Sequence, residues 1–315
     1  MLLADIPWAG RVWALPFLTV LAPSERYWQQ QGRNPKLLTD WARQILFQVQ
    51  RWCPARTLVV VADGAFASLQ LLSSWTKRRR PITCITRLRL DARLFGPAPP
   101  RKKGSMGRPR LVGARLPSLQ QILTCPSIVW QRWNVENWYG QGPRLVEVAS
   151  GTAIWYHTGL PPVPIRWVLV RDPKGKFETR ALLCTDPGQN PRQILQWFLW
   201  RWQVEVTFQE VRAHLGVETQ RQWSDLAITR TTPVLLGLFS IVTLLAHSLA
   251  RAGELPIRQA AWYCKTKPTF SDAIALIREQ LWHPANFSMS HSERHLMKIP
   301  RALFSGLCQA ACYAA

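Results

Sequence analysis

Apolar residues recur at helical spacing across residues 190–216 and predict one long helix with a marked beginning and end. Asn190 suits the N-cap, Pro191 the first helical position, and Gly216 the left-handed residue that ends many helices. One side of this helix is apolar: Trp200, Val204, Phe208, Val211 and Leu215. The adjoining side combines Ile194, Phe198, Arg201, Glu205 and Arg212. Taken alone, Arg201 and Glu205 would equally fit a surface ion pair worth roughly 0.3 kcal/mol.

Patterns upstream predict a sheet covered by helices. The apolar positions of Leu38–Trp52 follow a helical period, and residues 12–22 predict a strand. Residues 57–66 contain five consecutive apolar positions, which is typical of a central parallel strand buried on both faces. Asp63 follows that run, at the end of the strand where α/β proteins place their catalytic groups. An aspartate that caps a turn or a helix would fit the same position.

The middle of the chain changes character. Residues 96–115 are basic and rich in proline and glycine, which predicts a solvated loop. Four short strands follow, at 145–148, 152–157, 165–171 and 179–185, with Gly151 as one of the turns between them. Further on, residues 232–249 are apolar for about the minimum length of a membrane span, but Pro, Thr, Ser and His within them favour a buried core helix.

Composition narrows the choice of partner. The chain has 40 Lys and Arg against 18 Asp and Glu, a formal net charge of +22. Such an excess is unusual for an enzyme of small anions and typical of a protein that binds a polyphosphate. The 7 cysteines are scattered without a CxxC pair, which indicates a reducing compartment and argues against a zinc site.

Two motifs together resemble a known family. Phe198, Arg201, Glu205 and Arg212 have the spacing of the Y-x2-R-x3-E-x6-K signature of insertion-sequence DDE transposases, and the segment VVVADGAF resembles the one that bears their second catalytic aspartate. The likeness extends over residues 10–250. It implies an α/β fold with a ribonuclease H-like core, incomplete at the N-terminus, a β-rich insertion and a helical C-terminal tail.

The resemblance also implies an organisation. The first part of the core would span residues 1–76, and the β-rich insertion with its basic loop at 96–115 would span 77–180. The second part of the core, with the Glu205 helix, would span 181–250, and the tail 251–315.

By the same resemblance, Asp63 and Glu205 are the catalytic residues and ligands of Mg²⁺ or Mn²⁺, two ions in a complete site. The DNA-binding residues would be Phe198, Arg201 and Arg212, together with Arg108, Arg110, Lys102 and Lys103 of the basic loop. The partner would be double-stranded DNA, at the transposon ends and at the target. The protein would bind it as a dimer, and no membrane would be involved. The expected location is the cytoplasm, on the nucleoid.

One acid of the family pattern is not evident. Upstream of Asp63 the sequence offers only Asp5, before a predicted strand, Glu25 in a polar loop, and Asp40 in a predicted helix. We therefore expect an N-terminally shortened transposase that retains two of three catalytic acids.

Four functions are compatible with these patterns. The first is DNA cleavage and strand transfer by a DDE transposase. The second is a catalytically inactive DNA-binding remnant that lacks the first catalytic aspartate. Another ribonuclease H-like nuclease fits the acids but not the insertion and the signature spacing. A small membrane protein built on residues 232–249 fits only that segment.

Overall fold

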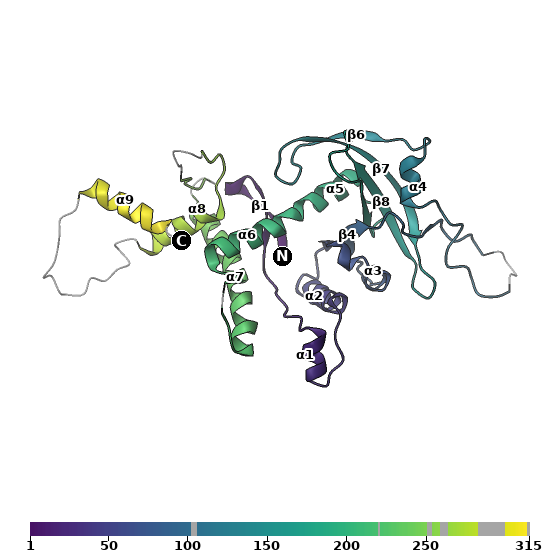
Figure 1. Ribbon diagram of the computed structural model, residues 1–315, viewed down its shortest axis with the longest axis horizontal. Coiled ribbons are helices and arrows are strands. Elements are labelled where there is room, and N and C mark those ends of the chain that lie inside the picture. The colour runs from purple at the N-terminus through teal and green to yellow at the C-terminus, as the bar shows by residue number, and fades with distance from the viewer. Residues whose placement is uncertain (102–105, 220, 251–253, 259–263, 283–299, 314–315) are drawn as a thin grey trace. The chain divides into compact units, whose positions relative to one another are not determined.

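A computed structural model describes residues 1–101, 106–219, 221–250, 254–258, 264–282 and 300–313 (Figure 1). Contacts group the chain into two compact units. Unit 1 comprises residues 1–21 and 203–315, and unit 2 comprises residues 22–202.

Unit 2 is built on a mixed seven-stranded sheet. The strands, in spatial order, are β3 (Val59–Val61), β4 (Thr83–Leu88), β9 (Arg180–Cys184), β8 (Val163–Arg171), β7 (Arg144–Trp155) and β5 (Leu94–Phe95), with β6 (Gln131–Val135) also paired to β7. β3 and β4 pair in parallel, and the other pairs are antiparallel. The predicted α/β class is confirmed.

Helices cover both faces of this sheet (Figure 1). One face packs on α2 (Leu38–Trp52), α3 (Leu69–Thr76) and α4 (Leu119–Thr124), and the other on α5 (Pro191–Trp200). Successive residues of a strand point to opposite faces, so in β8 Val168 joins the α5 side while Leu169 joins the α3 side. A short helix, α1 (Glu25–Gln30), precedes α2 and was not predicted.

Three sequence expectations about strands are corrected. The predicted strand at 57–66 is only three residues long and lies at the end of the strand order, where Val59 is 39% exposed. The predicted strands at 145–148 and 152–157 are one continuous strand, β7. Gly151 is therefore not a turn; it makes room for Trp167, because a Cβ atom there would lie 2.5 Å from the indole.

The long helix predicted for 190–216 is interrupted. α5 ends at Trp200, Arg201 forms a turn, and α6 (Trp202–Leu215) follows. Both predicted ends are confirmed: the Asn190 side chain accepts a hydrogen bond from the Arg192 N–H at 2.8 Å, and Gly216 has a φ of +71°. The division between the two units falls just after the interruption, between residues 202 and 203.

Unit 1 joins the start of the chain to its end. A hairpin of β1 (Leu2–Ile6) and β2 (Arg11–Leu15) packs with α6, α7 (Asp225–Leu249) and α8 (Phe270–Leu281); α9 (Arg301–Cys312) lies against α8. The strand predicted at 12–22 thus ends at Leu15, before Pro16, which has no N–H for a ladder. The core of unit 1 contains packed aromatic rings: the ring centroids of Phe239 and Phe270 lie 4.3 Å apart in a stacked pair, and those of Trp13 and Phe239 lie 5.7 Å apart.

The apolar segment at 232–249 lies within α7. By length and composition alone, α7 is the one helix of the described residues that could cross a membrane. One stripe of it, including Leu236, Phe239 and Val242, is buried in the core of unit 1, whereas Val234 and Leu244 on other sides are exposed. The prediction of a core helix is therefore correct for that stripe alone.

A buried carboxylate connects the segments that surround α8. Asp272 is 1% exposed and accepts hydrogen bonds from the N–H groups of Thr269 and Arg258, from the Tyr313 hydroxyl at 3.1 Å and from Lys265 Nζ at 3.0 Å. Burial opposes ionisation of this group. The bonds from Thr269, Lys265 and Arg258 outweigh it, so the pKa of Asp272 lies below its ordinary value.

This network predicts a pH dependence of stability. Because the folded pKa of Asp272 is lowered, its contribution is present above the ordinary value of 3.8 and is lost as the pH falls through the folded value. Asp272→Asn should lower the free energy of unfolding by about 2 kcal/mol near neutral pH, since hydrogen bonds to a charged group are lost. In urea unfolding, the gap between wild type and variant should shrink below pH 3.8. A gap that stays constant on acidification would contradict this assignment.

Candidate active site

Asp63 stands where β3 gives way to a single 3-10 turn, η2 (Gly64–Phe66). Its backbone is fixed by the neighbouring strand: the hydroxyl of Thr86, on β4, donates a hydrogen bond to the Asp63 carbonyl oxygen at 2.8 Å. Thr86 is fully buried, so the donor end of this bond is shielded from water, although Asp63 itself is exposed. The main chain of Asp63 is thereby held at the carboxyl end of the two parallel strands.

The side chain of Asp63 is not used for folding. Asp63 is the N-cap residue of η2 by position, but its carboxylate makes no capping hydrogen bond. Asp63 is exposed. In the part of the chain that the structure describes, hydrogen bonds reach its main-chain oxygen but none reaches its carboxylate, which also forms no ion pair. The capping interpretation therefore does not explain an aspartate here.

A cationic hollow of about 640 Å³ begins at the next residue, Gly64. Its lining includes Arg87, Arg89, Arg93 and His157, with Asp91 as an acidic member. Asp91 pairs with Arg89 through two hydrogen bonds of 2.7 and 2.8 Å, and these bonds hold the pKa of the Asp91 carboxyl below its usual value. The positive lining of the hollow, which begins one residue after Asp63, suits a phosphate.

Sequence reasoning missed this lining, although a signal for it exists. Arginine alternates with leucine in the segment Arg87-Leu88-Arg89-Leu90, and a period of two in a strand directs alternate residues to one face. Leu88 is buried while Arg87 and Arg89 are exposed.

Glu205 lies in the first turn of α6 and is exposed. It belongs to unit 1, whereas Asp63 belongs to unit 2, so no single unit contains both predicted catalytic acids. Arg212 is also exposed and makes a bidentate ion pair with Glu218, at 2.6 and 2.9 Å. The Glu218 carboxylate, and to a lesser extent the charge of Glu205, raise the pKa of Arg212.

Phe198 and Arg201 end the α5 segment of the signature. Phe198 is 2% exposed in the core between α5 and the sheet, so its ring is not offered at the surface. The Arg201 guanidinium lies 5.7 Å from that ring, in a cation–π arrangement. Phe198 thus packs beneath Arg201.

The basic loop is tied at its base. The Gly96 and Gly113 N–H groups donate hydrogen bonds to the carbonyls of Ala114 and Gly96, at 2.8 and 2.9 Å. Arg108 and Arg110 are exposed beyond this closure. Lys102 and Lys103, which were predicted to bind DNA, lie outside the described residues.

Most aromatic residues of the β-rich segment pack in the core. Trp133, Trp138 and Trp167 are buried. Trp130 is only partly buried, and its ring is covered by the Arg171 guanidinium at 3.8 Å.

The chemistry of the donors fits a hard divalent cation, but the described residues do not form a complete set of metal ligands. Carboxylate oxygens are the ligands that Mg²⁺ and Mn²⁺ prefer. Among the described residues no three His, Cys, Asp or Glu side chains are grouped to hold a metal ion. Of the upstream acids, Asp40 caps α2 and pairs with Arg43, Glu25 begins α1 and not a loop, and Asp5 lies exposed in β1, a strand that was not predicted.

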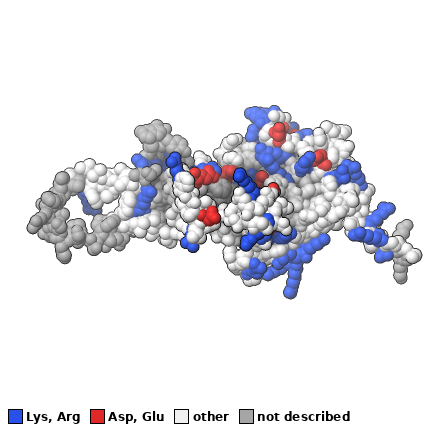
Figure 2. All heavy atoms as spheres, turned by 60° about the horizontal axis from the view of Figure 1, so that its bottom comes forward, with Lys and Arg blue, Asp and Glu red and all other residues white. Residues whose placement is uncertain are grey.

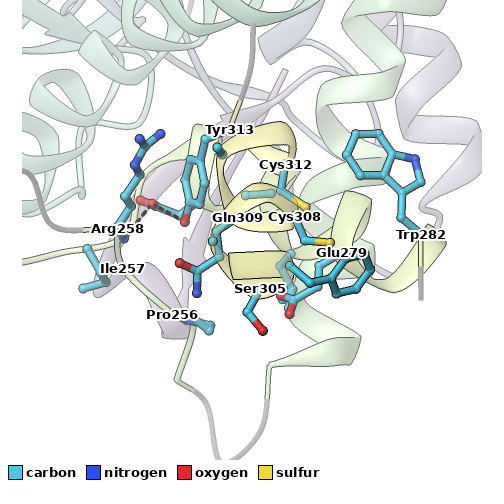
Figure 3. A pocket seen from close by; sticks show the side chains of 16 residues that line it. Pro256, Ile257, Arg258, Glu279, Trp282, Ser305, Cys308, Gln309, Cys312 and Tyr313 are labelled. Atoms are coloured by element: carbon cyan, nitrogen blue, oxygen red, sulfur yellow. Dashed lines mark hydrogen bonds between the residues drawn. The ribbon is translucent and has the colours of Figure 1, made fainter. Parts of the chain in front are cut away.

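Another hollow, of about 700 Å³, lies in unit 1 (Figure 3). It is lined by residues of α8, α9 and the 256–258 segment, including Arg258, Glu279 and Tyr313. Tyr313 is bonded to Asp272, and that carboxylate is already saturated with donors. This hollow includes none of the predicted site residues.

The face of the molecule drawn in Figure 2 is basic. Figure 2 shows lysine and arginine spread over the visible face with few acidic residues between them, as the 40 to 18 ratio requires. A cationic surface of this kind attracts a polyphosphate at long range.

Residues 4–144 match the family model described as DDE superfamily endonuclease. The match supports a DDE transposase-like family. It includes Asp63, its cationic hollow up to Arg93, and the basic loop, and it ends before Glu205. No curated protein matches the chain at a significant level. The mixed sheet with its helices is consistent with a ribonuclease H-like DDE nuclease fold. Nucleases of the DDE superfamily generally act on DNA and use divalent metals.

The bond from Thr86 to Asp63 generates a prediction. Thr86→Val removes the hydroxyl and leaves the Asp63 carbonyl with the hydrogen bond from the Phe66 N–H at 3.0 Å, so the loss of one of its two bonds should cost about 1 kcal/mol in urea unfolding. Plasmid nicking should fall as well, since Asp63 loses its fixed main chain. Thr86→Ser keeps the hydroxyl and should retain most of both. Equal behaviour of the Val and Ser variants would show that the bond does not position Asp63.

Proposed function

We propose that this protein is a DDE-type transposase that cleaves DNA and transfers strands at insertion-sequence ends. One observation supports this most strongly. Within the described residues the exposed Asp63 carboxylate has no hydrogen bond or ion pair, and the next residue, Gly64, lines a cationic hollow. Both belong to the segment that matches a DDE endonuclease model. A purely structural role for Asp63 would explain neither its free carboxylate nor the positive lining of the hollow.

Asp63 and Glu205 would hold Mg²⁺ or Mn²⁺. When bound, two such ions stabilise the attacking and leaving oxygens of an in-line phosphoryl displacement. Asp63 contributes a carboxylate on a main chain fixed by Thr86, so little reorganisation accompanies metal binding at that residue. Arg87 and Arg93, in the hollow next to it, would orient the phosphates of the strand being cut.

Arg201 and Arg212 would bind the DNA ends. The basic loop would contribute further contacts through Arg108, Arg110, Lys102 and Lys103. Arginine suits this role because its planar fork binds two phosphate oxygens at once. Arg212 already holds the Glu218 carboxylate in that bidentate manner, so DNA phosphate would replace Glu218 as its partner. We further propose action as a dimer on double-stranded DNA, in the cytoplasm on the nucleoid.

A second candidate is a DNA-binding protein without catalysis. The observation that favours it is the ligand set: the described residues include no group of three that could hold a metal ion. Both candidates predict DNA binding that weakens as salt rises, so only cleavage separates them.

The decisive experiment is nicking of supercoiled plasmid with Mn²⁺. We expect the wild-type chain to nick and both Asp63→Asn and Glu205→Gln to fall to the level of an EDTA control, because each loses a metal ligand. Glu178→Gln and Glu279→Gln each remove an exposed carboxylate elsewhere in the same two units and should nick like wild type.

Two outcomes would contradict the proposal. Nicking that survives both Asp63→Asn and Glu205→Gln would exclude these acids from the site. No nicking by the wild-type chain, with DNA binding retained, would favour the non-catalytic candidate.

A further inference from the structure

Three consecutive arginines form an exposed turn between α3 and β4, residues 78–80. The turn is held at both ends: the Lys77 N–H donates to the Ser73 carbonyl and the Ile82 N–H to the Trp75 carbonyl, each at 3.1 Å. None of the three arginines pairs with a carboxylate in the described parts of the chain. Three adjacent positive charges repel one another, so this arrangement favours an external anion.

A buried glutamine organises the turn from beneath. Gln50, on α2, is 5% exposed and makes two hydrogen bonds with it. Its side-chain oxygen accepts from Arg78 Nε at 2.7 Å, and its side-chain nitrogen donates to the Arg80 carbonyl at 2.8 Å. The Arg78 guanidinium also lies 4.0 Å above the ring of Phe47. One guanidinium and the backbone of the turn are therefore fixed before any ligand arrives.

The result is a hollow of about 550 Å³ lined by Gln50, Arg78, Arg79 and Arg80. A cation at the end of α3 would be favourable by itself, because it complements the helix dipole by about 0.3–1 kcal/mol. That effect accounts for Lys77 at the C-cap. It does not account for three further arginines or for the buried amide that holds them.

We infer that the Arg78–Arg80 turn is a binding site for the phosphates of the DNA backbone. Within the described residues, the terminal nitrogens of Arg78 and the whole guanidinium groups of Arg79 and Arg80 make no hydrogen bond, so the turn offers several donors to neighbouring phosphate oxygens. That the polyanion is DNA rests on the proposed function.

This site is separate from the hollow beside Asp63. The arginines precede β4, whereas Asp63 and Arg87 lie at the carboxyl ends of β3 and β4. Thr83 and Leu88 bound β4, and five residue steps of 3.3 Å separate its ends by about 17 Å. At 3.4 Å per base pair this equals about five base pairs of duplex. The turn would therefore hold the duplex flank and not the bond that is cut.

The test is the salt dependence of binding to a short DNA duplex of arbitrary sequence, measured by fluorescence anisotropy from about 50 to about 200 mM KCl. Each phosphate contact contributes about 0.9 to the slope of log affinity against log salt. Arg79→Gln with Arg80→Gln should therefore reduce the slope by about 1.8. Arg26→Gln with Arg33→Gln removes the same charge from exposed positions in and after α1 and should leave the slope unchanged.

A second variant tests the role of Gln50 without changing the charge. Gln50→Met keeps the volume but removes both hydrogen bonds, so affinity at fixed salt should fall while the slope stays near wild type. Thermal melting confirms that each variant is folded. A folded Gln50→Met protein with wild-type affinity would overturn the positioning by Gln50.

The site itself is overturned by an unchanged slope in the Arg79 and Arg80 double variant, or by an equal loss in the α1 control. It is also overturned if the double variant loses only binding to vesicles of phosphatidylcholine and phosphatidylserine in equal parts. Failure of the proposed function would appear elsewhere, as nicking that survives Asp63→Asn, and would leave the slope comparison intact.

Discussion

The sheet of unit 2 is buried on both faces, and this constraint determines where chemistry can occur. α5 covers one face, and α2, α3 and α4 cover the other. The charged side chains of the two candidate sites therefore lie near the ends of strands and in the connections between them. Asp63 follows β3, Arg87 and Arg89 lie at or beyond the end of β4, and the arginine turn at 78–80 precedes β4. Both candidate sites are thus consequences of the same layered core.

Electrostatics then separates structural acids from available ones. With 18 acids among 40 basic residues, most carboxylates would be expected to find a cation. Glu147 is held between Arg132 and Arg171, and these partners lower its pKa despite its desolvation. Asp272 is likewise saturated with donors. Asp63, by contrast, forms no ion pair within the described residues, so its carboxylate is available to a ligand.

Local signals predicted the parts of the fold that depend on neighbouring residues in the chain. The helix at Leu38–Trp52 and the two ends of the 190–216 segment follow from apolar period and from capping chemistry, and all are confirmed. The α/β class followed from the same patterns. Asp63 as a candidate followed from its place after an apolar run, but the four segment boundaries and the role of Glu205 stay predictions.

The predictions that were wrong concern contacts between residues far apart in the chain. Whether the run at 57–66 is central or at an edge is decided by which strands pair with it, and pairing leaves no local pattern. Gly151 is needed only because Trp167 lies opposite it in β8. The arginine turn gains its order from Gln50, 28 residues upstream of Arg78, a contact that no periodicity announces.

The central claim, that the Asp63 carboxylate is a metal ligand, can be tested without any turnover. Fe²⁺ substituted for Mg²⁺ generates hydroxyl radicals with ascorbate and peroxide, which cut the polypeptide close to the bound ion, and mass spectrometry locates the cuts. We predict cleavage near Asp63 in the wild-type chain, suppressed by excess Mg²⁺ and absent from Asp63→Asn. Cleavage that is absent near Asp63, or that persists unchanged in Asp63→Asn, would contradict the account.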